Sequence, residues 1–179
     1  MNNFARFALG VALGTAILPG AVAPAQVLKN HDSNAPVNFS ADRIEVQDRA
    51  DRVVVTGNVH VTQAGLALDA ARMTVAYRNE SGNGGIEIDR IDASGNVVVT
   101  KGNETARGSV AIYDLNRRLI TMLGNVQLVQ GSNRLTGGRL VIDLRTGRST
   151  VDGRGAGSGV DDSGGRVTGT FTVPQRDQQ

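Results

Sequence analysis

The sequence predicts an all-β protein built from many short strands. Gly is abundant at 23 residues and aromatic residues make up only 3%, which suits tight turns around an aliphatic interior. A Gly-Asn pair followed by alternating apolar residues occurs at 57–58, 95–96 and 124–125. Because Gly and Asn tolerate positive φ, we predict a turn at each pair and a half-buried strand after it. Three copies of one unit predict a repeat architecture.

Residues 1–25 are predicted to be a secretory signal peptide. Arg6 and the amino terminus supply positive charge, residues 7–18 form an apolar run, and small residues suited to cleavage follow, up to Ala25. The run is shorter than the roughly 20 residues that a membrane-spanning helix needs, which favours cleavage over an uncleaved anchor. We therefore expect an exported protein.

The rest of the chain is predicted to hold one domain between a polar lead-in and a tail. Polar, Gly-containing or charged segments between apolar strands mark the turns, and a run rich in Gly, Ser and Asp marks a loop before the last strand. The predicted segments are a flexible lead-in at 26–35, the β domain at 36–174, turns at 47–49, 79–85, 116–118 and 145–147, a Gly-rich loop at 153–165, a final strand at 166–174 and a tail at 175–179.

Alternation along the strands predicts an aliphatic interior. These side chains either fill an ordinary core or line an apolar trough between two sheets, and composition alone favours the core. The side chains predicted to point inward are Ile44, Val46, Val55, Val59, Val61, Leu68, Val75, Val97, Val99, Val126, Leu128, Leu140 and Ile142.

Motifs for catalysis, metal binding and nucleic-acid binding are absent from the sequence. His31 lies in the lead-in, and His60 alternates with valines that point it to solvent. The absence of Cys and the presence of only two His make a transition-metal site improbable, and Asp161-Asp162 lacks the spacing of a calcium loop. With 19 basic and 17 acidic side chains, the chain has no strong electrostatic attraction to nucleic acid. We expect no enzyme activity, metal or cofactor.

Several segments resemble the OstA-like family of periplasmic lipopolysaccharide-transport proteins, and specifically its soluble bridge component. The Thr-Gly-Asn-Val segment is the most specific part of the resemblance, which extends over nearly the whole mature chain. The segments that carry it are 36–42, 53–63, 70–73, 113–115, 123–128, 166–168 and 173–174.

This resemblance implies a V-shaped, twisted β-jellyroll of two antiparallel sheets whose trough takes the acyl chains of lipopolysaccharide. It also implies that molecules join head to tail, the last strand of one pairing with the first strand of the next. The implied lipid contacts are Val37, Phe39, Val97, Val99, Tyr113 and Leu115, and the implied assembly strands contain Val37, Phe39, Val167, Phe171 and Val173.

The resemblance further implies a location in the periplasm of a Gram-negative bacterium, with inner-membrane and outer-membrane components of the same pathway as partners. Three alternatives remain. One is a structural filament of the bactofilin kind, which is a β-solenoid, and another is the inner-membrane-anchored component of the same pathway. The third is an exported carbohydrate-active enzyme, which the absence of catalytic motifs disfavours.

Overall fold

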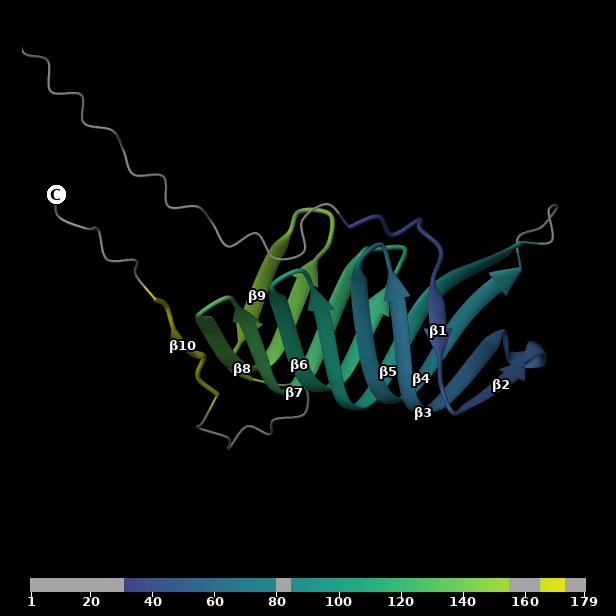
Figure 1. Cartoon of the computed structure of the whole chain (residues 1–179), viewed down its shortest axis with the longest axis horizontal. Coiled ribbons are helices and arrows are strands. Elements are labelled where there is room, and N and C mark those ends of the chain that lie inside the picture. Colours follow the sequence, from purple (N-terminus) through teal and green to yellow (C-terminus); the bar gives the residue numbers. More distant parts are fainter. Residues whose placement is uncertain (1–30, 80–84, 155–164, 173–179) are drawn as a thin grey trace, which may run out of the picture.

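The computed structural model describes residues 31–79, 85–154 and 165–172, and these contain ten strands and one short 3-10 turn (Figure 1). The predicted signal peptide, most of the loop at 79–85, most of the Gly-rich loop and the tail lie outside the described residues. The elements are β1 (Asn38–Ser40), β2 (Arg43–Gln47), η1 (Asp48–Ala50), β3 (Arg52–Gln63), β4 (Leu66–Asn79), β5 (Ile86–Lys101), β6 (Glu104–Asp114), β7 (Leu119–Gln130), β8 (Asn133–Asp143), β9 (Arg148–Asp152) and β10 (Thr168–Thr170).

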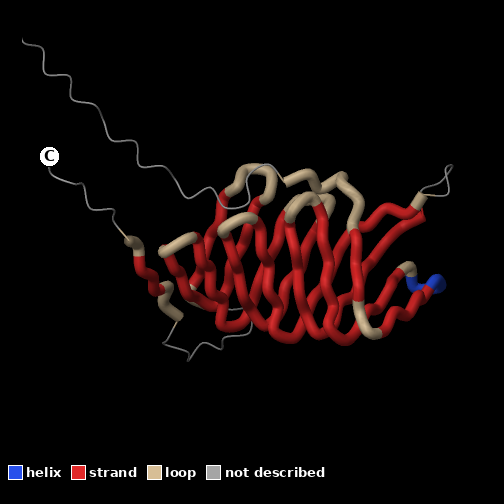
Figure 2. The backbone as a smooth tube through the Cα atoms, viewed as in Figure 1, coloured by secondary structure: helices blue, strands red, loops and turns tan. Residues whose placement is uncertain are grey.

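All pairings between these strands are antiparallel, and they join the ten strands into one sheet in the order β1-β3-β4-β5-β6-β7-β8-β10. β2 pairs with the first half of β3, and β9 pairs with the second half of β8. The predicted all-β fold is therefore confirmed, and its two sheets are halves of one bent sheet (Figure 2). Antiparallel neighbours also argue against a β-solenoid filament, whose stacked coils pair in parallel.

The Gly-Asn pairs lie inside long strands, and the prediction of short strands separated by turns at these pairs was wrong. Gly57 and Asn58 have φ of 79° and 45°, and the other two pairs have similar angles. At each pair the register shifts between strands, as between Thr56 and Val59 of β3. Two left-handed residues in succession form a bulge that bends a strand without ending it. The repeated unit is therefore a bend.

The bends divide the sheet into two arms. The first arm contains β1, β10 and the halves of β3 to β8 that meet at the turns 64–65, 102–103 and 131–132. The second arm contains β2, β9 and the other halves, which meet at η1 and at the turns 115–118 and 144–147, close to the predicted turns. We call the space between these two rows of turns, opposite the bends, the mouth.

Aliphatic side chains fill the space between the arms in the middle of the molecule. Most of the predicted inward residues are buried there, together with Tyr113 and two methionines. Ile44 and Val46 of β2 are exceptions, with 49% and 60% of their surface exposed, because no strand in the described part of the chain covers that end of the trough. The residues with at most 2% exposure include Val55, Val59, Leu66, Leu68, Met73, Ile91, Val97, Val99, Tyr113, Ile120, Met122, Leu140 and Ile142.

The two ends of the sheet are formed by short strands. β1 and β2 lie at one end, and β9 and β10 lie at the other (Figure 1). The final strand, predicted at 166–174, is confined to Thr168–Thr170 and pairs with residues 134–136 of β8. Val167 and Phe171 flank it with 42% and 63% exposure, and Val173 lies outside the described residues.

Candidate functional site

The trough is open at the end formed by β1 and β2, and an apolar cavity of about 260 Å³ lies there. Asp48 contributes the charged group to an otherwise apolar and aromatic lining. The lining residues are Phe39, Val46, Asp48, Val53, Val55, Val75, Tyr77, Ile86 and Ile88.

Pairing register places these side chains on the inner face of both arms. Phe39 of β1 lies opposite the buried Val61, and Val46 of β2 lies opposite Val53. Directly opposite residues in an antiparallel pair share one face of the sheet. Phe39 is 45% exposed and Ile86 is 65% exposed, so inward-facing hydrocarbon is in contact with solvent. Such a surface favours an apolar ligand, because burial of hydrocarbon stabilises a complex by about 25 cal/mol per Å².

A second, more polar cavity of about 490 Å³ adjoins the first, and the two share Ile86 and Ile88. It lies between the lead-in segment 33–37 and the turn 115–118, within the mouth. Its lining includes Gln63, Glu87, Asn116 and Arg118. The first cavity is apolar and the second is polar and open to solvent, so together they suit an amphipathic molecule.

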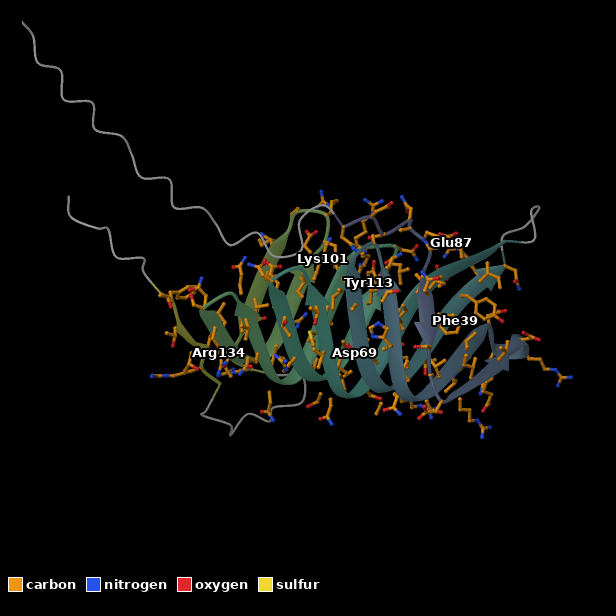
Figure 3. The ribbon with its side chains drawn as sticks, in the orientation of Figure 1. Phe39, Asp69, Glu87, Lys101, Tyr113 and Arg134 are labelled. Atoms are coloured by element: carbon orange, nitrogen blue, oxygen red, sulfur yellow. The ribbon has the colours of Figure 1, made fainter. Side chains whose placement is uncertain are left out.

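Further along the mouth, three side chains join the two arms. Tyr113 of β6 donates a hydrogen bond of 2.9 Å from its hydroxyl to Oε1 of Gln63, at the end of β3. Nε2 of His31 lies 3.1 Å from the same oxygen and 3.2 Å from the Tyr113 hydroxyl. All three residues are buried. Figure 3 shows Tyr113 in the middle of the molecule and Phe39 toward the β2 end.

Burial controls the ionisation of this cluster. It raises the pKa of the Tyr113 hydroxyl, against the smaller effects of its hydrogen bond with Ser33 and the positive charge of Arg118. It also lowers the pKa of His31, and the hydrogen bond with Gln63 opposes that shift. Both shifts favour the neutral forms, so at neutral pH the cluster is an uncharged bridge between the arms.

The predicted lipid contacts separate into two groups. Phe39 lines the apolar cavity, while Val37 and Leu115 line the polar one. Val97 and Val99, with 0% and 2% exposure, lie in the filled middle of the trough. Tyr113 has only 2% exposure, and His31 and Gln63 cover its hydroxyl. A charged residue at Tyr113 would therefore test the fold rather than the groove.

The site also contains Val53, Tyr77, Ile86 and Ile88, which the sequence did not indicate as contacts. Ile86 and Ile88 alternate, but they follow the polar loop at 79–85 and were not recognised as part of a strand. Alternation predicts that Ile44 and Val46 point inward, but it identifies only a face and not whether another strand covers that face. The lead-in was also predicted to be flexible, whereas its described part, 31–35, is bonded to Gln63 through the carbonyls of Ser33 and Ala35.

His60 is solvent-facing, as predicted, and its Nδ1 lies 2.6 Å from Oδ1 of Asp69 on the outer face of the sheet. Within the described ranges, no group of three His, Cys, Asp or Glu side chains is placed to hold a metal ion. The same part of the chain contains no helix with the length and apolar character needed to span a bilayer.

Comparison with known proteins places this site in a family context. Residues 38–148 match the family described as LptA/(LptD N-terminal domain) LPS transport protein. An uncharacterized protein of Rhizobium meliloti (strain 1021) is 32% identical over 127 residues, covering 69% of this chain and 68% of that protein. The crystal structure of LptH from Pseudomonas aeruginosa, the LptA homologous periplasmic component of the lipopolysaccharide transport device, matches with a TM-score of 0.67. It is 21% identical and the match covers 80% of this chain and 99% of LptH, which indicates a shared fold.

Proposed function

Because this chain belongs to the LptA/LptD N-terminal domain family of lipopolysaccharide transport proteins, we propose that it carries lipopolysaccharide through the periplasm by shielding its acyl chains. The observation that carries this proposal is the open end of the trough. There Phe39, Val46 and Ile86 face inward with 45% to 65% of their surface exposed, and no segment of the described chain covers them.

Physical chemistry supports a carrier at this position. An acyl chain in water costs about 0.8 kcal/mol for each exposed CH₂ group, so several chains cannot cross an aqueous compartment without a cover. The apolar cavity accepts hydrocarbon, and the adjoining polar cavity leaves room for a hydrated group. Shielding of this kind needs no chemical reaction, so we propose a carrier and not an enzyme.

Head-to-tail assembly would extend the shield beyond one molecule. β1 and β2 at one end, and β9 and β10 at the other, are the last strands of the sheet within the described chain. An edge strand can bind another strand through backbone hydrogen bonds, and exposed apolar side chains beside both edges would become buried on contact. We propose that copies join β10 to β1, and that further components at the inner and outer membranes bind the same edges.

Substitution at the open end tests the lipid site. We expect Val46→Asp to lower the capture of lipid A by at least tenfold, because the carboxylate would occupy the apolar cavity. The unfolding free energy should change by less than about 1 kcal/mol, since Val46 is already 60% exposed. Glu45→Gln, next to it on the outer face of β2, is the matched control. Normal capture of lipid A by Val46→Asp would exclude this end of the trough as the site.

Deletion of residues 167–173 tests the assembly separately. The deletion removes β10 and the exposed Phe171, so we expect light scattering to show monomers where the intact chain forms concentration-dependent oligomers. Lipid A capture by the monomer should be retained, because the cavity lies at the opposite end. Unchanged oligomers would contradict the β10-to-β1 contact.

The inner-membrane-anchored component of the same pathway is the alternative that shares this fold. Edman sequencing of the protein isolated from its native cells would separate the two. A start at Gln26 supports the soluble carrier, and an intact N-terminus in the membrane fraction supports the anchored component.

A further inference from the structure

Residues 31–37, which we call the strap, run along the mouth of the trough before the chain enters β1 (Figure 1). The side chain of Gln63 holds the strap to the first arm, donating hydrogen bonds of 3.0 Å and 2.9 Å to the carbonyls of Ser33 and Ala35. The Ser33 hydroxyl also lies within hydrogen-bond distance, 3.3 Å, of the Tyr113 hydroxyl of the second arm, whose own proton is donated to Gln63. The strap therefore contacts both arms at the place where they approach each other.

His31 is the part of the strap that is most deeply inserted, with 7% of its surface exposed. Its Nε2 faces Oε1 of Gln63, which can only accept a hydrogen bond, so Nε2 carries the proton. Nδ1 is then an unprotonated acceptor, and this buried atom has no hydrogen-bond partner among the described residues. The ring also meets the Tyr113 ring edge to face, with centroids 6.3 Å apart. This arrangement favours neutral His31, because a proton on Nδ1 would be buried without an acceptor.

The middle of the trough has no room for a ligand while the strap is in place. Ile91, Met122 and Tyr113 have at most 2% exposure and lie in one continuous cluster of core side chains between the arms. An acyl chain that enters at the open end can pass Tyr113 only if the arms separate. Separation of the arms breaks the hydrogen bond between Tyr113 and Gln63, and it also removes the binding position of His31 beside these two side chains.

We propose that the strap is a displaceable latch, in which His31 holds the arms together over the filled middle of the trough and an entering acyl chain releases it. This inference rests on the proposed function for its ligand, but the latch itself is a property of the empty protein. It divides the trough into an open end that is ready to bind and a middle that opens only when the strap leaves.

The latch is expected to weaken in acid. Burial lowers the pKa of His31 below its ordinary value of 6.5, and the positive charges of Lys101 and Arg118 act in the same direction. The hydrogen bond with Gln63 and the negative charge of Asp32 oppose this shift. A released His31 regains its ordinary pKa, so protons bind the released strap more tightly. Docking of the strap is therefore strongest above pH 6.5 and weakens as the pH falls from 6.5 toward the lowered pKa.

Spin labels can follow the strap in the intact protein, because the chain contains no cysteine. One label at Asn34→Cys, exposed on the strap, and one at Arg145→Cys, exposed on the second arm, report their separation by pulsed electron paramagnetic resonance. At pH 8 we expect one narrow distance distribution without ligand, and a second, broader population with lipid A bound. His31→Ala should show the broad population without lipid A, and should take up lipid A at least threefold faster. His60→Ala, which alters the outer-face histidine, is the matched control.

Each outcome bears on the latch independently of transport. Lipid A that is bound while the strap distance stays unchanged would overturn the proposal and leave the carrier function intact. If no variant binds lipid A, the carrier function fails, and the ligand-free measurements still decide about the latch. An identical distance distribution for His31→Ala and the parent protein, both without ligand, overturns the latch proposal. Release of the strap below pH 6 in the parent and in His60→Ala supports it.

Discussion

The open end and the filled middle of the trough are built from the same alternating strands but differ in what covers them. In the middle, each arm covers the other, and Val97, Ile120 and Met122 have 0% exposure. At the open end, Val46 and Ile86 point to the same space with 60% and 65% exposure, because the sheet stops there. Apolar character therefore indicates stability in one region and binding in the other, and the difference lies in the neighbours rather than in the residues.

The largest effect should come from a charge in the middle. We expect Val97→Asp to abolish the folded state, since an unpaired carboxylate at a site with 0% exposure costs several kcal/mol, a large part of a typical domain's stability. Circular dichroism with a thermal scan measures this. The neighbouring Val98, on the opposite face of β5, provides the control Val98→Asp, which should fold. A folded Val97→Asp that fails only to capture lipid A would place the lipid site in the middle as well.

A side chain at a bend should have the next largest effect. A Cβ at position 57 would clash with the side-chain carboxylate of Asp42, and the backbone there has φ of 79°. We expect Gly57→Val to lower the unfolding free energy by about 2 to 3 kcal/mol in urea titrations, because clash and strain add. Gly65→Val is the control for strain alone, as its Cβ would meet nothing within 4 Å. Equal losses for the two variants would show that the contact with Asp42 is unimportant.

A smaller effect is expected where the two regions meet. Tyr113→Phe removes the hydroxyl that bonds to Gln63 and keeps the buried ring, so the unfolding free energy should fall by about 1 kcal/mol. The amide of Ala35 should then exchange faster with deuterium, since the strap loses one of its anchors. Tyr77→Phe is the matched control, because its hydroxyl bonds to Asp48 away from the strap. An unchanged rate of deuterium exchange at the Ala35 amide would show that the strap does not depend on the Tyr113 hydroxyl.

The smallest effect on stability is expected at the open end. Ile86→Ser should change the unfolding free energy by no more than about 0.5 kcal/mol, because the side chain is 65% exposed. It should nevertheless weaken lipid A binding severalfold, as measured by fluorescence displacement. Ile91→Ser in the middle should do the reverse, with a large loss of stability. If Ile86→Ser destabilised the protein as much as Ile91→Ser, the contrast between the two regions would be wrong.

The sequence predicted well which side chains face inward, but it predicted poorly which of these inward faces are covered by other strands. Alternation placed Val55, Val59 and Val126 inside, where the structure also has them. The same rule placed Val46 inside, where it faces inward but is left uncovered. The sequence also predicted that His31 lies in a flexible lead-in. Local patterns cannot reveal its contact with Gln63, because Gln63 is 32 residues away. Of the candidate contacts, Phe39 lines the apolar cavity while Val97 lies in the filled middle, and alternation alone cannot separate the two.

The sequence by itself determined that this is an all-β chain with three equivalent Gly-Asn positions, because side-chain alternation and tolerance of positive φ are local properties. Only the tertiary structure decided that those positions bend long strands instead of ending them, since a bulge and a turn have similar sequences and differ in how the strands continue to pair. The tertiary structure also decided which apolar faces are covered, because that depends on where the sheet ends and on how its two arms meet.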